Sequence, residues 1–337
     1  MNQRTHAWIA IRAIKLLEDE GSVPSLVKLM KPYAKQASIG AWIPDKRDAK
    51  LGSAQTQNHV FKIKPFNGNL KTRFIMSKQQ TFKLLTDKRL ARDFLDRHSD
   101  ILDDAWWKES YKADPPPGKH LANRAMALSI GNIDLLIIGD PIVQEILPGR
   151  IDFISNIAAD VKSSQGQVAL FFFMLSHFVA DSLMPCHCDD RDLSDYDTGL
   201  HKEWESHWSK IVGKEFDEKP LLESNLTGDQ LLSLAMDVDD KFNIQFANKV
   251  PGIQTKDIWE EIVLLCRASF GIASVIAPPT NYPYKPKPQV FAKFSDLFTK
   301  DEEGKALLKD VDQTIMHDAV LNVALVWKDI WMKFKDK

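Results

Sequence analysis

The sequence predicts an all-α protein, and three observations support this fold class. Apolar residues recur at the spacing of a helical face along much of the chain, as Ile9, Ala13 and Leu16 do near its start. Alternation of apolar and polar residues, which is typical of strands, is scarce. No repeat of fixed period divides the 337 residues. We therefore expect a bundle of helices without a sheet.

The first two helices are predicted near the start of the chain. Thr5 is a suitable N-terminal cap for a helix that runs to about Glu18, because its hydroxyl can accept a hydrogen bond from the first turn. A second helix is predicted over residues 24–36, with Pro24 in its first turn. Further helices are predicted over residues 78–110, 119–131, 150–162, 167–184, 199–213, 227–247, 254–276 and 303–335.

Two segments carry proline and glycine instead of a helical pattern. Residues 37–75 contain several of both and are predicted to be irregular. Residues 278–291 are rich in proline, so an extended connector is expected before the last helix.

The composition is that of an ordinary globular protein, with 44% hydrophobic and 27% charged residues. A net charge of −2 gives no overall attraction to nucleic acid or to an anionic membrane. No apolar run approaches the length of about 18 residues that a membrane-spanning helix needs. The start of the chain lacks a signal-peptide pattern, and an odd count of three cysteines fits a reducing compartment, so a cytoplasmic location is expected.

Two predicted helices each carry a histidine and a carboxylate one turn apart. His177 and Asp181 have this spacing, and so do His201 and Glu205. Residues four apart lie on one face of a helix, so each pair presents both side chains in the same direction. Imidazole and carboxylate groups together are ligands for zinc and similar divalent ions. With His187 in the turn between the two helices, the sequence predicts a metal cluster.

Each pair also has an interpretation without a metal. Residues 167–184 are apolar nearly all round, so His177 and Asp181 fit a hydrogen-bonded pair within a core. His201 and Glu205 fit a partly exposed polar helix. These explanations, and a separate one for His187, must all hold if there is no metal, which is why the metal interpretation is preferred.

The spacing of these residues resembles that of a known family. The run His177-x3-Asp181-x5-His187-x13-His201-x3-Glu205 is similar to the ligand motif of the secreted bacterial zinc-dependent phospholipases C. The sequence around His6 resembles their first helix. The single-strand-specific zinc nucleases are more distant relatives with the same fold and cluster. They end the motif with an aspartate at a longer spacing, so Glu205 favours the phospholipase branch.

The resemblance implies a helical bundle around a buried cluster of two to three zinc ions, with Asp181 as a shared ligand. The ligands that it implies for the three sites are, in order, Asp45, His59, His177 and Asp181; then His187, His201 and Glu205; and finally His6, Asp181 and the amine and carbonyl of Met1. Family members carry a tryptophan where this chain has Met1.

The resemblance also implies a division of the chain. Residues 1–337 would form one domain of this type. The stretch between His59 and His177 is much longer than in the compact secreted enzymes, so residues 61–150 are expected to be an insertion. Residues 279–337 are expected to be a C-terminal helical extension.

The implied activity is hydrolysis of a phosphodiester by a zinc-dependent enzyme. Clustered zinc ions neutralise phosphate oxygens, lower the pKa of a water molecule and stabilise the leaving alkoxide. Asp45 is the candidate general base. The expected substrate is a phospholipid, with peripheral membrane contact through aromatic residues such as the Trp106-Trp107 pair.

Two alternatives remain open from the sequence. A nuclease acting on single-stranded nucleic acid would use the same cluster, with an aromatic residue such as Phe61 stacking on a base. A non-enzymatic interaction protein stabilised by metal is the third candidate. The sequence Cys186-His187-Cys188 also resembles a zinc-binding triplet, but only His187 matches the motif, so the two cysteines are predicted to pack or to support the ligands.

Overall fold

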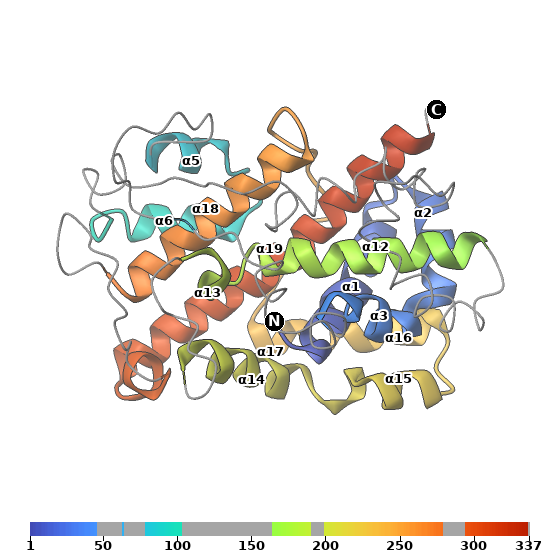
Figure 1. Cartoon of the computed structure of the whole chain (residues 1–337), viewed down its shortest axis with the longest axis horizontal. Helices are drawn as coiled ribbons and strands as arrows, with labels where there is room; N and C mark the ends of the chain where they lie inside the picture. Colours follow the sequence, from blue (N-terminus) through green and yellow to red (C-terminus); the bar gives the residue numbers. More distant parts are fainter. Residues whose placement is uncertain (46–62, 64–77, 103–163, 190–198, 279–293, 336–337) are drawn as a thin grey trace.

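The computed structural model describes residues 1–45, 63, 78–102, 164–189, 199–278 and 294–335. It confirms the all-α prediction, because every regular element in these ranges is helical (Figure 1). The elements are, in chain order, α1 (Gln3–Glu20), α2 (Pro24–Met30), η1 (Lys31–Gln36), α3 (Ala37–Gly40), α5 (Lys78–Leu84), α6 (Leu90–Arg97), α12 (Ser164–Asp181), α13 (Pro185–Cys188), α14 (Leu200–Val212), η3 (Lys214–Phe216), α15 (Glu218–Glu223), α16 (Gly228–Met236), α17 (Asp239–Phe242), α18 (Ile258–Ile276), η4 (Ser295–Thr299) and α19 (Glu302–Lys335).

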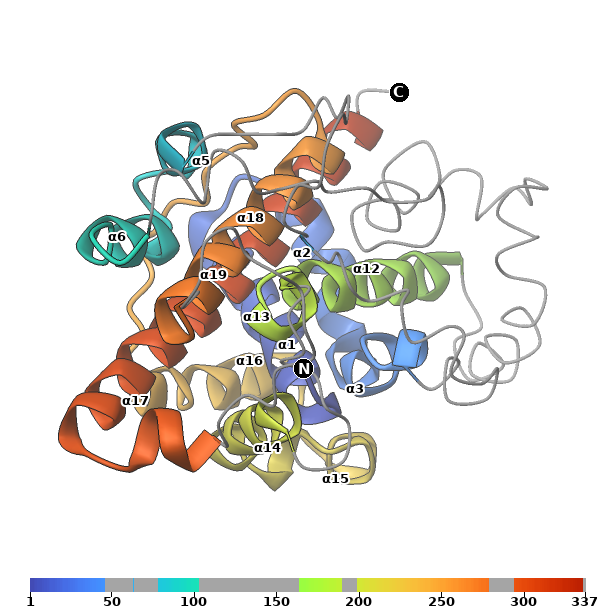
Figure 2. The same cartoon turned by 60° about the vertical axis from the view of Figure 1, so that its left-hand side comes forward.

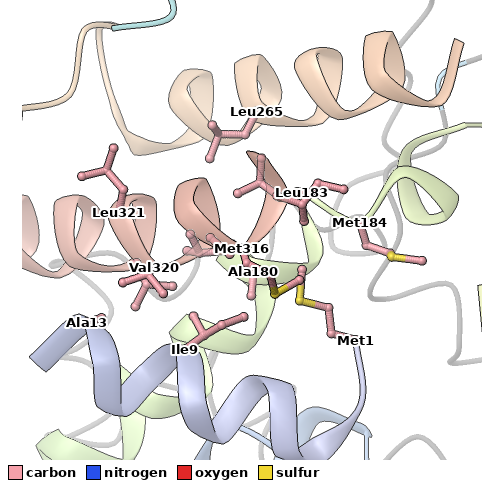
Figure 3. Packing of buried hydrophobic residues seen from close by; sticks show 14 of the residues in the cluster. Met1, Ile9, Ala13, Ala180, Leu183, Met184, Leu265, Met316, Val320 and Leu321 are labelled. Atoms are coloured by element: carbon pink, nitrogen blue, oxygen red, sulfur yellow. The ribbon is translucent and has the colours of Figure 1, made fainter. Parts of the chain in front are cut away.

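The long helices α1, α12, α18 and α19 supply most of the core. Helix α19 packs against α1, α12 and α6, and α18 packs against α6 and α13 (Figures 1 and 2). Most buried apolar residues of these helices belong to one continuous cluster, and Leu170, Phe171 and Met174 of α12 form a second, smaller cluster with Ile43. Within the larger cluster, Ile9 and Ala13 of α1 face Val320 of α19 (Figure 3). The apolar face predicted for the first helix is therefore the face that meets the core.

Helix α12 is buried along most of its length, as its nearly uniform apolar sequence predicts. Its backbone is tied to α19, because the indole N–H of Trp327 donates a hydrogen bond of 2.9 Å to the carbonyl of Phe172. Trp327 is fully buried, which agrees with a packing role for this residue. The middle of α12 is thus tied to α19, and His177 and Asp181 follow within the same buried helix.

The beginning of α1 differs from the prediction. Asn2 precedes the first helical residue, and Thr5 is a buried residue inside the first turns. Thr5 as N-terminal cap was therefore wrong. The chain places helical residues before it because the turn that contains Asn2, Gln3 and Arg4 is held by partners distant in sequence.

The segment after α1 also departs from the prediction of one helix over residues 24–36. The α-helix stops at Met30 and continues as the 3₁₀-helix η1, since Pro32 lacks the N–H that an α-helix would use. The helical path then extends through α3, where an irregular segment was expected. Gly40 allows α3 to approach α12, because a Cβ there would lie 2.6 Å from the Cβ of Phe173.

The single helix predicted over residues 78–110 is instead broken between α5 and α6. The break is stabilised from a distance, since the carboxylate of Asp318 accepts hydrogen bonds of 2.9 and 2.8 Å from the backbone N–H groups of Leu90 and Ala91. These contacts cap α6 and explain why it begins where it does. Both helices contribute to the main core cluster.

The helix predicted over residues 227–247 is likewise two helices, α16 and α17. Thr227 and Gln230 form a reciprocal capping box at the start of α16. Asn243 adopts a left-handed conformation with φ of 55° and ends α17. The predictions over residues 199–213, 254–276 and 303–335 are confirmed by α14, α18 and α19 to within a few residues.

Several predictions fall outside the described residues. These are the helices over residues 119–131 and 150–162, the connector between residues 279 and 291, the larger part of the expected insertion, and the residues His59, Phe61, Trp106 and Trp107. Among the described helices, none combines the length and the apolar character that crossing a bilayer requires.

Asp312 of α19 joins helix α14 to the core. Its Oδ1 accepts a hydrogen bond of 2.6 Å from the indole N–H of Trp208, and its Oδ2 lies 2.7 Å from Nε2 of His207. Asp312 is 5% exposed and Trp208 is fully buried. Since both partners belong to α14, this carboxylate fixes the helix that carries His201 and Glu205.

Removal of this carboxylate by Asp312→Ala should lower the free energy of unfolding by about 1–3 kcal/mol, because the buried Trp208 N–H loses its acceptor. Urea unfolding followed by tryptophan fluorescence measures the change. The matched control is Asp310→Ala, also on α19, which removes an ion pair of 2.9 Å with the exposed Arg97 of α6. That control should cost no more than about 1 kcal/mol. Equal losses in the two variants would contradict the role given to Asp312.

Candidate metal centre

Asp181, the last residue of α12, lies at the centre of the predicted ligands. Its Oδ1 is 2.8 Å from the Met1 nitrogen and 3.4 Å from Nε2 of His6. Its Oδ2 is 3.2 Å from Nε2 of His177 and 3.5 Å from Nδ1 of His187. The residue is 1% exposed. One buried carboxylate therefore faces basic groups from α1, α12 and α13.

The first group of ligand atoms consists of His6, Asp45 and His177, whose ligand atoms lie within 4.8 Å of one another. The rings of His6 and His177 are stacked with centroids 4.1 Å apart. Nδ1 of His177 donates a hydrogen bond of 2.8 Å to the carbonyl of Ala41. Because a carbonyl only accepts, this bond places a proton on Nδ1 and turns Nε2 toward the carboxylates of Asp181 and Asp45.

The second group consists of His187, His201 and Glu205, again within 4.8 Å. Nε2 of His201 is 2.8 Å from Oε1 of Glu205 and 3.0 Å from Nε2 of His187. Oε1 of Glu205 is also 2.8 Å from the Met1 nitrogen. The Met1 nitrogen therefore links this group to Asp181 and so to the first.

Local sequence explains how the second group forms. Pro185 begins the short helix α13. A hydrogen bond of 2.9 Å from the His187 N–H to the carbonyl of Met184 closes the turn at the start of this helix. This turn carries His187 back toward the end of α12. His201 and Glu205 lie one turn apart on α14 and face the site, and the neighbouring Trp204 on the same side of the helix is buried in the core.

The Met1 amine is the cation of the site in this structure. Burial alone lowers its pKa, but the carboxylates of Asp181, Glu205 and Asp45 outweigh burial and raise the pKa from 8.0 to about 11. Burial by itself also favours neutral carboxyl groups, yet the Met1 ammonium and the nearby histidines hold the pKa values of Asp181 and Glu205 well below their usual range. Both carboxylates are therefore ionised at neutral pH.

The histidines divide into two kinds. Burial and the adjacent His177 lower the pKa of His6 to about 3. Burial also lowers the pKa of His187 well below its usual value. For His177 burial acts in the same direction, but Asp181 and Asp45 outweigh it and raise the pKa. Neutral His6 and His187 beside ionised carboxylates are the protonation states that ligate a metal.

The spacing of the donor atoms fits a metal ion such as zinc. Ligand atoms at about 2.0–2.1 Å from a tetrahedral zinc lie about 3.3 Å from one another. The separations from Asp181 to His6 and His177 are 3.4 and 3.2 Å, and that from His177 to Asp45 is 3.5 Å. Both ring nitrogens of His6, and Nδ1 of His187, are buried without a hydrogen-bond partner among the described residues. A neutral imidazole has one nitrogen with a lone pair, and burying that nitrogen without a partner is costly unless an ion accepts the lone pair.

Of the predicted ligands, His59 lies outside the described residues, and the structure brings the other eight together. Ile63, the nearest described residue to His59 on its C-terminal side, donates a backbone hydrogen bond of 2.9 Å to the carbonyl of Cys188. It also forms an isolated bridge with Asp189. Ile63 is therefore paired with the residues that follow His187.

Sequence reasoning missed Trp42. Its indole is half-buried, with ring centroids 6.3 Å from His6 and 6.4 Å from His177. It forms an aromatic wall beside the first group of ligands. The only signal in the sequence was its position three residues before Asp45, within a segment predicted to be irregular.

The three cysteines are buried, and no disulfide joins them. The thiol of Cys188 donates to the carbonyl of Ser182 at 3.3 Å. Burial and the neighbouring Cys188 raise the pKa of the Cys266 thiol well above its usual value. Metals bind the thiolate form, so these contacts favour packing over ligation.

Comparison with known protein families, with characterised proteins and with solved structures finds no match to this chain. The resemblance to the zinc-dependent phospholipases C therefore rests on the residues and spacing of the ligand motif.

Replacement of the central carboxylate tests whether this centre binds metal. Zinc should raise the thermal midpoint of metal-free protein, since a ligand at about 100 times its Kd adds about 2.7 kcal/mol of stability. Asp181→Asn should abolish most of this rise, because the carboxylate borders ligands of both groups. The control Asp229→Asn, at a carboxylate 77% exposed and paired with Lys31, should keep it. An undiminished zinc effect in Asp181→Asn would exclude Asp181 as a shared ligand.

Proposed function

We propose that this protein is a zinc-dependent phosphodiesterase of the phospholipase C type. The observation that carries the proposal is the junction of the two ligand groups at Asp181 and the Met1 nitrogen, each within 2.8 to 3.5 Å of its neighbours. A single structural zinc needs only four ligands. Eight predicted ligand residues gathered together, with the carboxylate of Asp181 shared among them, instead support a cluster of ions.

The donor set supports zinc among the common divalent ions. All of these donors are nitrogen or oxygen, and imidazole nitrogen makes up a large share of them, which suits zinc better than magnesium or calcium. When bound, clustered zinc ions neutralise phosphate oxygens, lower the pKa of an attacking water and stabilise the leaving alkoxide.

The exposure of the ligands indicates the side from which substrate approaches. The side chains of His6 and His177 are fully buried, and that of Asp181 is 2% exposed. Asp45 is 26% exposed and Glu205 is 21% exposed. The open face of the cluster is therefore bordered by these two carboxylates.

This placement supports Asp45 as the general base. Its carboxylate lies 3.5 Å from Nε2 of His177 and still reaches solvent, so it can orient a water molecule and accept its proton. Asp181, being buried, has no such access and serves to hold the ligands together. Glu205 and His201 border the opposite side of the opening, where they fix the second group.

We expect a chelator to abolish hydrolysis of an aryl phosphodiester and added zinc to restore it. Asp45→Asn should lower kcat by about 10²–10⁴-fold, the usual contribution of a general base. Asp229→Asn should keep wild-type activity, because that carboxylate is exposed and pairs with Lys31. Zinc-loaded protein that hydrolyses no phosphodiester would favour the non-enzymatic alternative.

A second candidate function, cleavage of single-stranded nucleic acid, is favoured by Trp42. A half-buried indole beside the ligands offers a flat apolar surface on which a base can stack. The spacing of His201 and Glu205 instead favours the phospholipase type. The two candidates share phosphodiester chemistry and differ in what Trp42 contacts.

Substitution of this tryptophan separates the two substrate classes. If the substrate is a nucleic acid, Trp42→Ala should raise KM for a single-stranded oligonucleotide by about 5–150-fold, given about 1–3 kcal/mol for one stacked base. Trp42→Phe should restore part of the affinity. For a phosphatidylcholine substrate we expect the wild type to cleave mixed micelles and to leave the oligonucleotide intact. Cleavage of neither substrate by active protein would exclude both assignments.

A further inference from the structure

Three consecutive side chains hold the first turn of α1 against other elements. Nη2 of Arg4 donates a hydrogen bond of 2.9 Å to Asp217, whose other oxygen accepts from Nε of the same guanidinium. Nε2 of Gln3 donates to the Glu218 carboxylate at 3.1 Å and to the Ser38 carbonyl at 3.0 Å. Nδ2 of Asn2 donates to the Glu205 carbonyl at 3.3 Å. We name Asn2, Gln3 and Arg4, with these partners, the clamp.

The partners of the clamp come from three separate helices. Asp217 is the N-terminal cap residue of α15 and Glu218 is its first residue. Ser38 belongs to α3, and Glu205 belongs to α14. The first turn of a helix has N–H groups without intrahelical partners and frays readily. Here side chains directed at α3, α14 and α15 restrain it from three directions.

The restrained turn is the one that carries two predicted ligands. His6 follows Arg4 by two residues, and its Nε2 lies 3.4 Å from Oδ1 of Asp181. The Met1 nitrogen lies 2.8 Å from the same oxygen. Metal–ligand distances tolerate deviations of only about 0.2 Å. A small shift of this turn would therefore remove two ligands at once while leaving His177, His187 and His201 in place.

We propose that Arg4 and Asp217 are positioning residues for the metal site that contains His6, and that Gln3 assists them. They touch no ligand atom themselves, and they act by fixing the turn on which His6 and Met1 lie. The bidentate form of the Arg4–Asp217 pair suits this role, because two parallel hydrogen bonds fix orientation as well as distance. The inference rests on the proposed function only in requiring that the centre binds zinc.

The same helix provides a matched control. Arg12, two turns further along α1, forms a bidentate pair with Asp239 of α17, with distances of 3.1 and 2.9 Å from its Nε. Arg12 is 4% exposed, whereas the side chain of Arg4 is 24% exposed. Loss of the Arg12 pair should therefore affect stability more than loss of the Arg4 pair. Loss of the Arg4 pair should affect metal binding more.

The experiment compares Arg4→Gln, Asp217→Asn and Arg12→Gln in the full chain. Metal-free protein is titrated with Zn²⁺ against a competing chelator, and bound zinc is counted after gel filtration. Arg4→Gln and Asp217→Asn should each weaken one zinc site by about 10–100-fold, as loss of a group that orients a ligand commonly does. Their metal-free thermal midpoints should stay near that of the wild type. Arg12→Gln should lower the midpoint and keep the wild-type zinc count, and Arg4→Lys should recover part of the lost affinity.

Three outcomes overturn the inference in distinguishable ways. If the wild type binds zinc and both Arg4→Gln and Asp217→Asn bind it with the same count and affinity, the clamp does not position the site, and the proposed function stands. If the wild type itself binds no zinc, the proposed function and the clamp fail together. A weakened site in Arg12→Gln equal to that in Arg4→Gln would also contradict the clamp, because the effect would then follow from helix stability alone.

Discussion

The carboxylate of Asp181 is buried at the end of a helix that is itself apolar and enclosed, with basic nitrogens on each side. An ionised carboxylate in such surroundings is stable only where positive charge or a metal ion compensates for lost hydration. The Met1 ammonium supplies that charge in this structure, at 2.8 Å. The arrangement of α1, α13 and α14 around the end of α12 can be understood as meeting this one requirement.

On the helices around Asp181, some side chains pack in the core and others form the candidate metal site. On helix α14, Trp204 and Trp208 are buried in the core, where the Trp208 N–H donates to the Asp312 carboxylate. His201 and Glu205 of the same helix border the open face of the ligand cluster. Helix α1 packs Ile9 and Ala13 against α19 (Figure 3). Its first turns carry His6, whose Nε2 lies 3.4 Å from Oδ1 of Asp181. Met1 has both roles. Its side chain packs in the core near Ala180 (Figure 3), and its nitrogen lies 2.8 Å from Oδ1 of Asp181. The ligands therefore gain rigidity from the same core that stabilises the protein.

Local periodicity was enough to predict the pairs His177/Asp181 and His201/Glu205, because the helix repeat alone places residues four apart on one face. The all-α class followed from the same regularity. The features that were missed depend on contacts between distant residues. Arg4 binds Asp217, which is 213 residues away in the sequence. The start of α6 is capped by Asp318, which is 228 residues from Leu90 in the sequence. No short-range signal identified Asn2 in place of Thr5 as the residue before α1, or placed Trp42 beside two histidines, since both follow from tertiary packing.

The account depends most on the claim that nitrogen and oxygen side chains hold several zinc ions around Asp181. X-ray absorption at the zinc edge, on protein loaded with Zn²⁺ and freed of excess metal, tests this directly. The account predicts more than one zinc ion per chain, with nitrogen and oxygen neighbours at about 2.0–2.1 Å and no sulfur at about 2.3 Å. Sulfur neighbours would assign the metal to Cys186 and Cys188 instead, and a chain that retains no zinc would contradict the account as a whole.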